Sequence, residues 1–200
     1  VTQDDIVDAL ERVTVGLPRS SALSTDVRER VAVHEMGHAI VGTMIEEYDD
    51  VLRVTIVPRT SGAGGFTSFT SQEHRGVDGL YTKDYLMAQL AVLLAGRAAE
   101  ALVLGEKTVS VGASGDIQRA QQLSEQMVME WGMGQRIPPK QVRGSETLTR
   151  IDAEVEHLMD DAYTMATSLL NSQRAALLSL TQDLLEQETM DGERVRQKLR

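Results

Sequence analysis

Apolar residues recur every three or four positions along most of this chain, which is the spacing of one face of an α-helix. The pattern predicts five long helices with a short helix at each end. They span residues 2–13, 25–47, 82–104, 114–131, 145–171, 172–187 and 191–199. Thr2 and Ser114 are expected as N-caps, and Gly105 as the residue that ends the third helix. The last three segments predict a C-terminal helical hairpin with a short final helix.

Two short segments alternate apolar and polar residues instead, which predicts β-strands. Residues 51–58 form a β-branched run that ends at a proline, and residues 66–70 follow a glycine-rich turn. Together they predict a small sheet with one strand at an exposed edge. Such an edge can accept an extended peptide as a further strand, or it can simply be capped, and the sequence leaves both interpretations open. The expected fold is therefore mainly α with a small β-sheet.

Composition narrows the class of protein. The 200 residues are 42% hydrophobic, which is enough for one sizeable core. A net charge of −10 argues against nucleic acid as a main partner, because phosphate recognition needs clustered Lys and Arg. Cysteine is absent, so disulfides and thiolate metal sites are excluded. A bound metal ion must be held by nitrogen and oxygen atoms.

The sequence contains no recognisable targeting signal, membrane span or ATPase motif. No run of 18 apolar residues spans a bilayer, and no signal peptide opens the chain. The chain begins at Val1, so we interpret it as a piece of a longer protein whose other segments lie outside it. It contains no G-x-x-x-x-G-K-[ST] phosphate loop, and we expect no ATP hydrolysis by that route.

The segment His34-Glu35-Met36-Gly37-His38 carries the chemistry. On a helix, residues four apart share one face, so both imidazoles can reach one zinc ion. Glu35 then lies beside the metal, where its carboxylate can take a proton from a water molecule that the metal activates and pass it to a leaving amine. This pattern is typical of a zinc peptidase.

A chance match is the alternative. Histidine occurs four times in this chain, so a random H-E-x-x-H is expected in on the order of one in a few hundred such sequences. Apolar residues on both sides of the motif predict that its helix is buried, and buried imidazoles need partners. The small residues Gly37 and Ala39 leave room for a substrate chain or a second helix.

A catalytic zinc ion has three protein ligands, so one more donor is required. The continuation H-x-x-G-x-x-H, which would supply a third histidine, is excluded because Val41 and Met44 stand at its glycine and histidine positions. His74 and His157 are interpreted as surface residues.

Two carboxylates on predicted helices are better candidates for the third ligand, Glu100 and Asp116. Spacing does not choose between them. Asp116 stands two residues past a predicted cap, so it can equally serve to complement the helix dipole. Both interpretations remain open from the residues alone.

A series of ordered motifs resembles the peptidase domain of the FtsH-type membrane-bound AAA proteases, which is an Asp-zincin. The motifs are V-H-E-M-G-H-A at 33–39, V-T-I-V-P-R at 54–59, L-A-G-R-A-A-E at 94–100, G-A-S-G-D-I at 112–117, M-V at 127–128, W-G-M at 131–133, I-D-A-E-V at 151–155 and L-L-E-Q-E-T at 184–189. The resemblance runs nearly end to end and implies a zincin-like helical metallopeptidase domain.

The resemblance also implies roles for individual residues. His34, His38 and Asp116 are implied as ligands of one Zn²⁺ ion per chain, and Glu35 as the general base. Glu100 is implied to lie beside the metal, where it orients a ligand imidazole or has a structural role.

The family further implies how the whole protein is organised. Residues 1–20 resemble the end of the ATPase lid and a linker, and residues 21–200 the zinc peptidase domain. ATP then acts only through a motor that this chain lacks. The implied substrates are unfolded polypeptides, the implied assembly is a homo- or hetero-hexamer, and no nucleic acid is involved. The fragment itself is expected to be soluble, while the parent is held in a bacterial inner, mitochondrial or plastid membrane by segments outside this chain.

Two departures from the family pattern keep alternatives open. Gly115 stands where the family has Asn, which is expected to loosen the turn that aims Asp116, and the chain between residues 134 and 144 is shorter than usual. One alternative is a catalytically silent member that acts in ring assembly or partner binding. Another is an unrelated zincin that uses Glu100 as its third ligand.

Overall fold

The computed structural model describes residues 9, 12–13, 16–19, 23–60, 62–70, 80–135 and 144–200. The predicted helix over residues 2–13 lies largely outside this set, and His74 lies outside it altogether. The same holds for most of the shortened segment between residues 134 and 144, and for the predicted domain boundary at residues 20 and 21. Those features stay as predictions.

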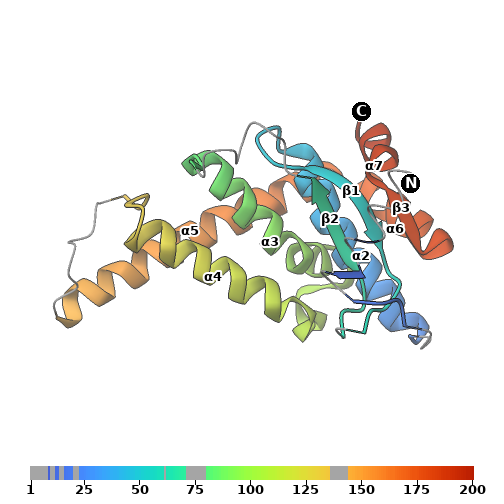
Figure 1. The fold of residues 1–200 in the computed structure, drawn as a ribbon, viewed down its shortest axis with the longest axis horizontal. Coiled ribbons are helices and arrows are strands. Elements are labelled where there is room, and N and C mark those ends of the chain that lie inside the picture. The colour runs from blue at the N-terminus through green and yellow to red at the C-terminus, as the bar shows by residue number, and fades with distance from the viewer. Residues whose placement is uncertain are drawn as a thin grey trace.

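Long helices and one small sheet make up the described structure, which confirms the predicted mainly α class. The helices are α2 (Thr25–Met44), α3 (Lys83–Leu104), α4 (Ser114–Met129), α5 (Ser145–Ser172), α6 (Arg174–Gln187) and α7 (Gly192–Leu199), with short 3₁₀ turns at Glu106–Thr108 and Val111–Ala113. The strands are β1 (Asp50–Thr55), β2 (Phe66–Thr70) and β3 (Thr189–Asp191). The sheet lies at one end of the molecule, and α4 and α5 extend away from it (Figure 1).

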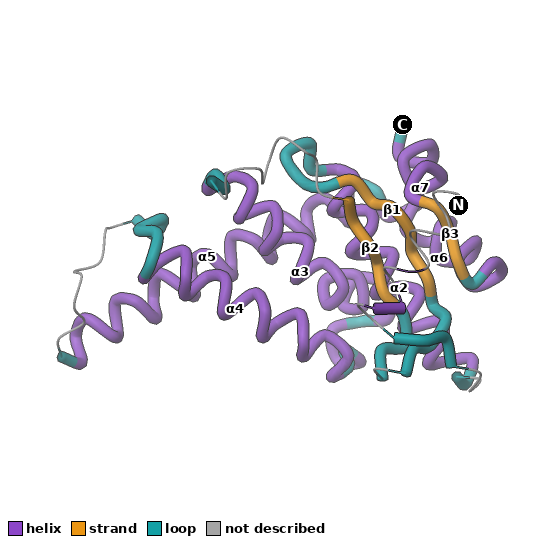
Figure 2. Tube along the Cα trace, viewed as in Figure 1, coloured by secondary structure: helices purple, strands orange, loops and turns teal. Residues whose placement is uncertain are grey.

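The sheet has three antiparallel strands in the order β2-β1-β3 (Figure 2). In the central strand, Val54 pairs with Thr67 of β2 on one side and with Met190 of β3 on the other. The order places β2 at an edge, which agrees with the predicted exposed edge. Strand β3 was not predicted, because three residues are too few to establish an alternating pattern.

Helices α2 and α3 form the centre of the core. A Cβ atom on Gly37 would lie 2.6 Å from the carbonyl oxygen of Ala95 and 2.6 Å from the Cβ atom of Ala99. Glycine at this position therefore allows α3 to pack directly on α2. Of the two uses that the sequence suggested for these small residues, a second helix accounts for Gly37.

Helix α3 is long and apolar enough to cross a membrane by length and composition. In the fold it packs against α2, α4 and α5, and most of its apolar segment is buried inside the protein. Its hydrophobicity is therefore accounted for by its place at the centre of the core.

The predicted element ends need small corrections. Helix α2 ends at Met44 instead of continuing to residue 47. Ser114 is not an N-cap: it has helical backbone angles and is the first residue of α4, while the hydroxyl of Ser110 accepts the N–H of Gly112 in the preceding 3₁₀ turn. The two helices of the predicted hairpin meet at Gln173, and α5 then packs mainly on α3 while α6 packs on α2.

Candidate metal centre

The H-E-x-x-H segment lies in the buried middle of α2. His34, Glu35 and His38 are 9%, 7% and 8% exposed. One helical turn separates the two histidines, and their Nε2 atoms lie 3.1 Å apart. The sequence spacing therefore produces the expected pair of imidazoles on one helix face.

Helix α3 leaves space for both rings by presenting bare backbone to them. A Cβ atom on Gly96 would lie 2.5 Å from Nε2 of His34 and 2.6 Å from Nε2 of His38. Any side chain at this position would displace the two nitrogen atoms that face each other. Gly96 therefore makes the site possible, and its position in the apolar α3 pattern gave no sign of this role.

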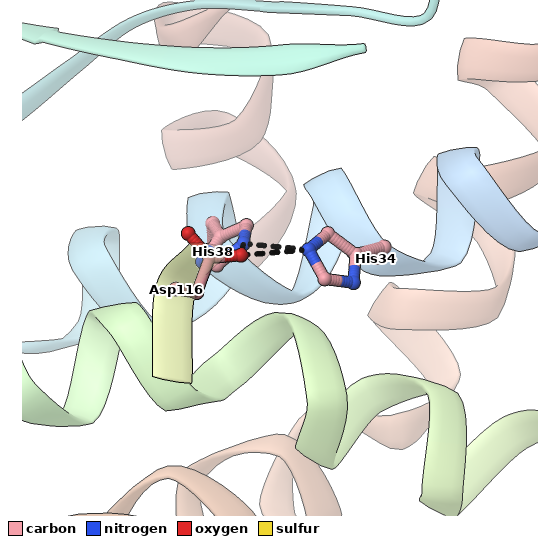
Figure 3. Close-up of side chains that lie close together, drawn as sticks. All are labelled: His34, His38 and Asp116. Carbon is pink, nitrogen blue, oxygen red and sulfur yellow. Dashed lines mark hydrogen bonds and ion pairs between the residues drawn. The ribbon is translucent and has the colours of Figure 1, made fainter. Parts of the chain in front are cut away.

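Asp116 comes from the first turn of α4 and completes a three-residue group. Its Oδ2 atom lies 3.2 Å from Nε2 of His34 and 3.5 Å from Nε2 of His38. Figure 3 shows the three side chains pointing toward one another. Among the described residues they form the group whose donor atoms all lie within 4.8 Å of one another. Two imidazole nitrogens and one carboxylate oxygen are a donor set that suits zinc.

The far nitrogen of each ring is also held. Nδ1 of His34 lies 2.9 Å from Oε1 of Glu100, and Nδ1 of His38 lies 2.7 Å from the carbonyl oxygen of Val92. Both contacts suit an Nδ1–H donor, which leaves the Nε2 lone pairs directed to the centre of the group. Glu100 thus contacts the side of His34 that faces away from Asp116.

Glu100 is held in turn by two groups outside the metal centre. Its Oε2 atom accepts a hydrogen bond of 2.9 Å from Arg30 and one of 3.1 Å from the backbone N–H of Ser110. Burial would raise the pKa of this carboxyl, but the hydrogen bonds from His34, Arg30 and Ser110 outweigh it and lower the pKa to about 2. Glu100 is therefore a fixed anion beside the ring.

The electrostatics of the group favour positive charge. Burial by itself lowers the pKa of His34, but the hydrogen bonds with Asp116 and Glu100 outweigh it and raise the pKa to about 10. Burial acts on Asp116 in the opposite sense, yet its contacts with His34 and His38 hold its pKa well below the ordinary value. Two carboxylates around two rings thus attract a cation, and a metal ion would take the place of the proton.

Arg119 holds the other oxygen of Asp116. Its guanidinium lies 2.6 Å from Oδ1, and its Nε–H also donates to the carbonyl oxygen of Gly115. Gly115 itself lies in the first turn of α4 and is not among the glycines with positive φ. The departure at this position therefore leaves an ordinary helical turn beneath Asp116.

Glu35 contacts strand β2. The hydroxyl of Thr67 lies 2.9 Å from Oε2 of Glu35 and 3.0 Å from its backbone carbonyl oxygen. Burial is the main cause of a raised pKa at Glu35. Thr67, Arg119 and Arg30 were not predicted as site residues, because none belongs to a local motif.

A cleft of about 1150 Å³ contains this group. His34, Glu35, His38 and Asp116 line it, and so do the consecutive residues 65–69. Neighbouring residues of a strand point to opposite faces, so a cleft that touches all of them runs along the strand edge. The metal centre and the edge of β2 therefore share one open space.

His157, which is also described, does not belong to the three-residue group. Its side chain is 51% exposed on α5 and contacts Asp161 on the same helix at 2.9 Å. This agrees with its interpretation as a surface residue.

Comparison with known proteins finds relatives that are named as zinc metalloproteases. The chain is 38% identical over 212 residues to ATP-dependent zinc metalloprotease FtsH 3 of Synechocystis sp.. That alignment covers 96% of this chain and 34% of the relative. It is 38% identical over 211 residues to ATP-dependent zinc metalloprotease FtsH 2 of Symbiobacterium thermophilum, and the alignment covers 100% of this chain and 35% of the relative. The chloroplastic FTSH 1 of Arabidopsis thaliana is 37% identical over 212 residues, with 96% and 30% covered.

The chain thus spans about a third of the length of these curated relatives. The family model of peptidase family M41 matches residues 21–198, which is nearly the whole chain. That match agrees with the resemblance found in the ordered sequence motifs. The chain belongs to peptidase family M41.

Proposed function

We propose that this chain is a zinc endopeptidase domain in which His34, His38 and Asp116 hold one Zn²⁺ ion. The observation that carries the proposal is the convergence of these three donors in a cleft. Two nitrogens and one oxygen form an open three-ligand set, as in catalytic zinc sites, which keep a fourth position free. The relatives named ATP-dependent zinc metalloproteases support zinc as the metal.

Glu35 acts as the general base in this proposal. When bound, the ion polarises the scissile carbonyl group and lowers the pKa of the attacking water molecule. Glu35 lies next to His34 and lines the same cleft, so its carboxylate is placed to accept a proton from water and return it to the leaving amine. Glu100 and the carbonyl oxygen of Val92 fix the two imidazoles by their Nδ1 atoms.

The substrate is an unfolded polypeptide that lies along β2 in extended form. The edge position of β2 and the cleft beside residues 65–69 support this arrangement. Backbone hydrogen bonds to a strand edge accept almost any sequence, which suits an enzyme that cuts unfolded chains.

We propose two parts for the chain. The end of an ATPase lid and its linker span residues 1–20, and the peptidase domain spans residues 21–200. ATP acts through a motor module that this chain does not contain. By analogy with the family, six copies assemble into a homo- or hetero-hexamer, and the parent protein is held at a bacterial inner, mitochondrial or plastid membrane.

Two other functions make different predictions. A silent family member would keep the fold without holding zinc. An unrelated zincin with Glu100 as ligand would keep zinc in Asp116→Ala and lose it in Glu100→Ala. The contact of Glu100 with Nδ1 of His34, on the far side of the ring from Asp116, favours Asp116 as the ligand.

Cleavage of a fluorogenic unstructured peptide by the zinc-loaded chain and by Glu35→Gln tests the proposal. We expect cleavage by the chain, loss of cleavage in Glu35→Gln, and one zinc per chain in both proteins. His157→Ala is the matched control, because it removes an exposed histidine outside the cleft. Unchanged cleavage in Glu35→Gln would disprove the role of Glu35. If neither protein cleaves although both hold zinc, the same pair is compared after fusion to the ATPase module of a relative.

A further inference from the structure

We propose that Thr67 of β2 is a positioning residue that fixes the carboxylate of Glu35. This inference rests on the proposed function, because it assigns the partner of the proposed general base. It starts from a difference between neighbours: the imidazoles are held by several groups of α3 and α4, whereas Glu35 turns toward the sheet.

The contact between Thr67 and Glu35 restricts the side chain in a particular way. The Thr67 hydroxyl lies 2.9 Å from the carboxylate and 3.0 Å from the backbone carbonyl of the same glutamate. A hydroxyl has one proton, so it donates to one of these oxygens at a time. In either case its oxygen lies between the two ends of Glu35, which fixes the rotamer of a side chain that otherwise has three rotatable bonds.

The Thr67 hydroxyl is itself well placed. Threonine is branched at Cβ and its χ1 angle is restricted in a strand. The backbone of Thr67 is paired with Val54 of the central strand, so the position of its Cα atom is set by the sheet. A serine in its place would keep the hydroxyl with more rotational freedom.

Close packing of β2 on α2 brings the hydroxyl within reach. A Cβ atom on Gly65 would lie 2.7 Å from Cγ1 of Val31 and 3.1 Å from Cγ of Glu35. Phe69 makes the second close contact between strand and helix. A Cβ atom on Gly42 would lie 2.6 Å from Cε1 of the Phe69 ring. Glycine at one position of each contact therefore lets the strand lie directly across the helix, with Thr67 between the two contacts.

Among the described residues, Thr67 bonds one carboxylate oxygen of Glu35 and leaves the second for chemistry. Thr67 contacts Oε2, and no hydrogen bond from the described residues reaches Oε1. Since Glu35 lines the cleft, holding one oxygen directs the other toward a water molecule at the metal centre. Thr67 thus links the strand proposed to receive the peptide with the base proposed to act on it.

The test compares three variants of the chain. Thr67→Val removes the hydroxyl and keeps the shape, Thr67→Ser keeps the hydroxyl, and Thr149→Val on α5 is the matched control. The Thr149 hydroxyl donates to the carbonyl oxygen of Ser145 on its own helix and does not line the cleft. Two measurements are made: the order of the Glu35 side chain, by crystallography and ¹³C NMR of labelled carboxylates, and kcat and KM for the fluorogenic peptide.

We expect Thr67→Val to release the Glu35 carboxylate into several rotamers and to lower kcat about tenfold, the size of one hydrogen bond to a charged group. KM and zinc content should stay within about twofold of the original, since ligands and strand edge are intact. Thr67→Ser should restore most of kcat, and Thr149→Val should behave as the unmodified chain.

Other outcomes overturn the inference in distinct ways. An ordered Glu35 and unchanged kcat in Thr67→Val would show that the contact is dispensable. A rise in KM alone would assign Thr67 to peptide binding. Loss of zinc or of folding in both Thr67→Val and Thr67→Ser would assign it to the framework of the fold. Cleavage retained in Glu35→Gln would refute the proposed function. The order of the Glu35 carboxylate in the Thr67 variants would still test whether Thr67 positions it.

Discussion

The two sides of helix α2 fix their side chains by different means. Toward α3, the imidazoles of His34 and His38 are enclosed by bare backbone at Gly96 and bonded by Glu100 and Val92. Toward β2, Glu35 meets the hydroxyl of one threonine on an edge strand. Both sides line the same cleft, but the imidazoles are held by neighbouring helices and Glu35 by one hydroxyl of a strand.

This difference suits the two tasks that we propose. Metal ligands must keep one geometry, and neighbouring helices in a close-packed core provide it. A general base must reach both water and substrate, and Glu35 contacts the strand that we propose receives the peptide. Changes on the α3 side should therefore affect metal binding first, and changes on the β2 side should affect turnover.

The largest effect is expected for Gly96→Ala. The added Cβ atom would lie 2.5 Å from Nε2 of His34, so the rings must shift apart from their common centre. We expect zinc affinity to fall by at least about 100-fold, more than when an outer hydrogen bond to a ligand is lost. Competition with a fluorescent chelator measures this, with circular dichroism to verify folding. Full zinc affinity in Gly96→Ala would contradict the proposed packing of the site.

A smaller loss on the same side is expected for Glu100→Gln. The glutamine amide is uncharged, so Nδ1–H of His34 loses a carboxylate acceptor and Arg30 loses its anionic partner. We expect zinc affinity to fall about 10- to 100-fold, with the metal still bound at saturating zinc. Complete loss of binding at any zinc concentration would instead favour Glu100 as a ligand.

Arg119→Ala should have a modest effect. The guanidinium holds Oδ1 of Asp116, but its side chain is 67% exposed, so water screens the interaction. We expect zinc affinity to fall about two- to fivefold. Arg150→Ala is the control, because it breaks an exposed pair with Glu146 on α5. Isothermal titration with zinc and a competing chelator resolves the two variants, and an equal loss in both would refute a specific role for Arg119.

Gly115→Ala should produce the smallest change. A Cβ atom at this helical position would meet no atom within 4 Å, in contrast to Gly96. We expect the free energy of unfolding to rise by about 0.5 kcal/mol, because alanine loses less backbone entropy than glycine in a helix. Urea denaturation measures this, and zinc affinity should not change. A large loss of affinity would mean that Asp116 needs the freedom of the preceding glycine.

The sequence predicted the elements better than their contacts. The alternation in residues 66–70 predicted β2 with its observed bounds, and the apolar spacing predicted α3 to within one residue at its start. Strand β3 has three residues and forms because the turn after α6, with Glu188 in the left-handed region, brings it beside β1. No local pattern reports such an encounter.

Local spacing and distant contacts contributed differently to the candidate site. His34, Glu35 and His38 lie within two helical turns, so the 3.6-residue period of the helix was sufficient to bring them together. Asp116 and Glu100 are separated from His34 by 82 and 66 residues, and the spacing of the sequence left both open as the third ligand. Resemblance to a family favoured Asp116, and the geometry then placed the two carboxylates on opposite nitrogens of the same ring.

The sequence by itself determined the helix that carries the histidines, the mainly α class, the absence of thiolate ligands and the family. The tertiary structure alone decided which glycine leaves space for the rings, which carboxylate faces Nε2, and which hydroxyl meets Glu35. The physical reason is the range of the interactions. Helix periodicity and residue chemistry act over a few neighbouring residues, whereas the contacts of Gly96, Asp116 and Thr67 exist only after α3, α4 and β2 have packed around α2.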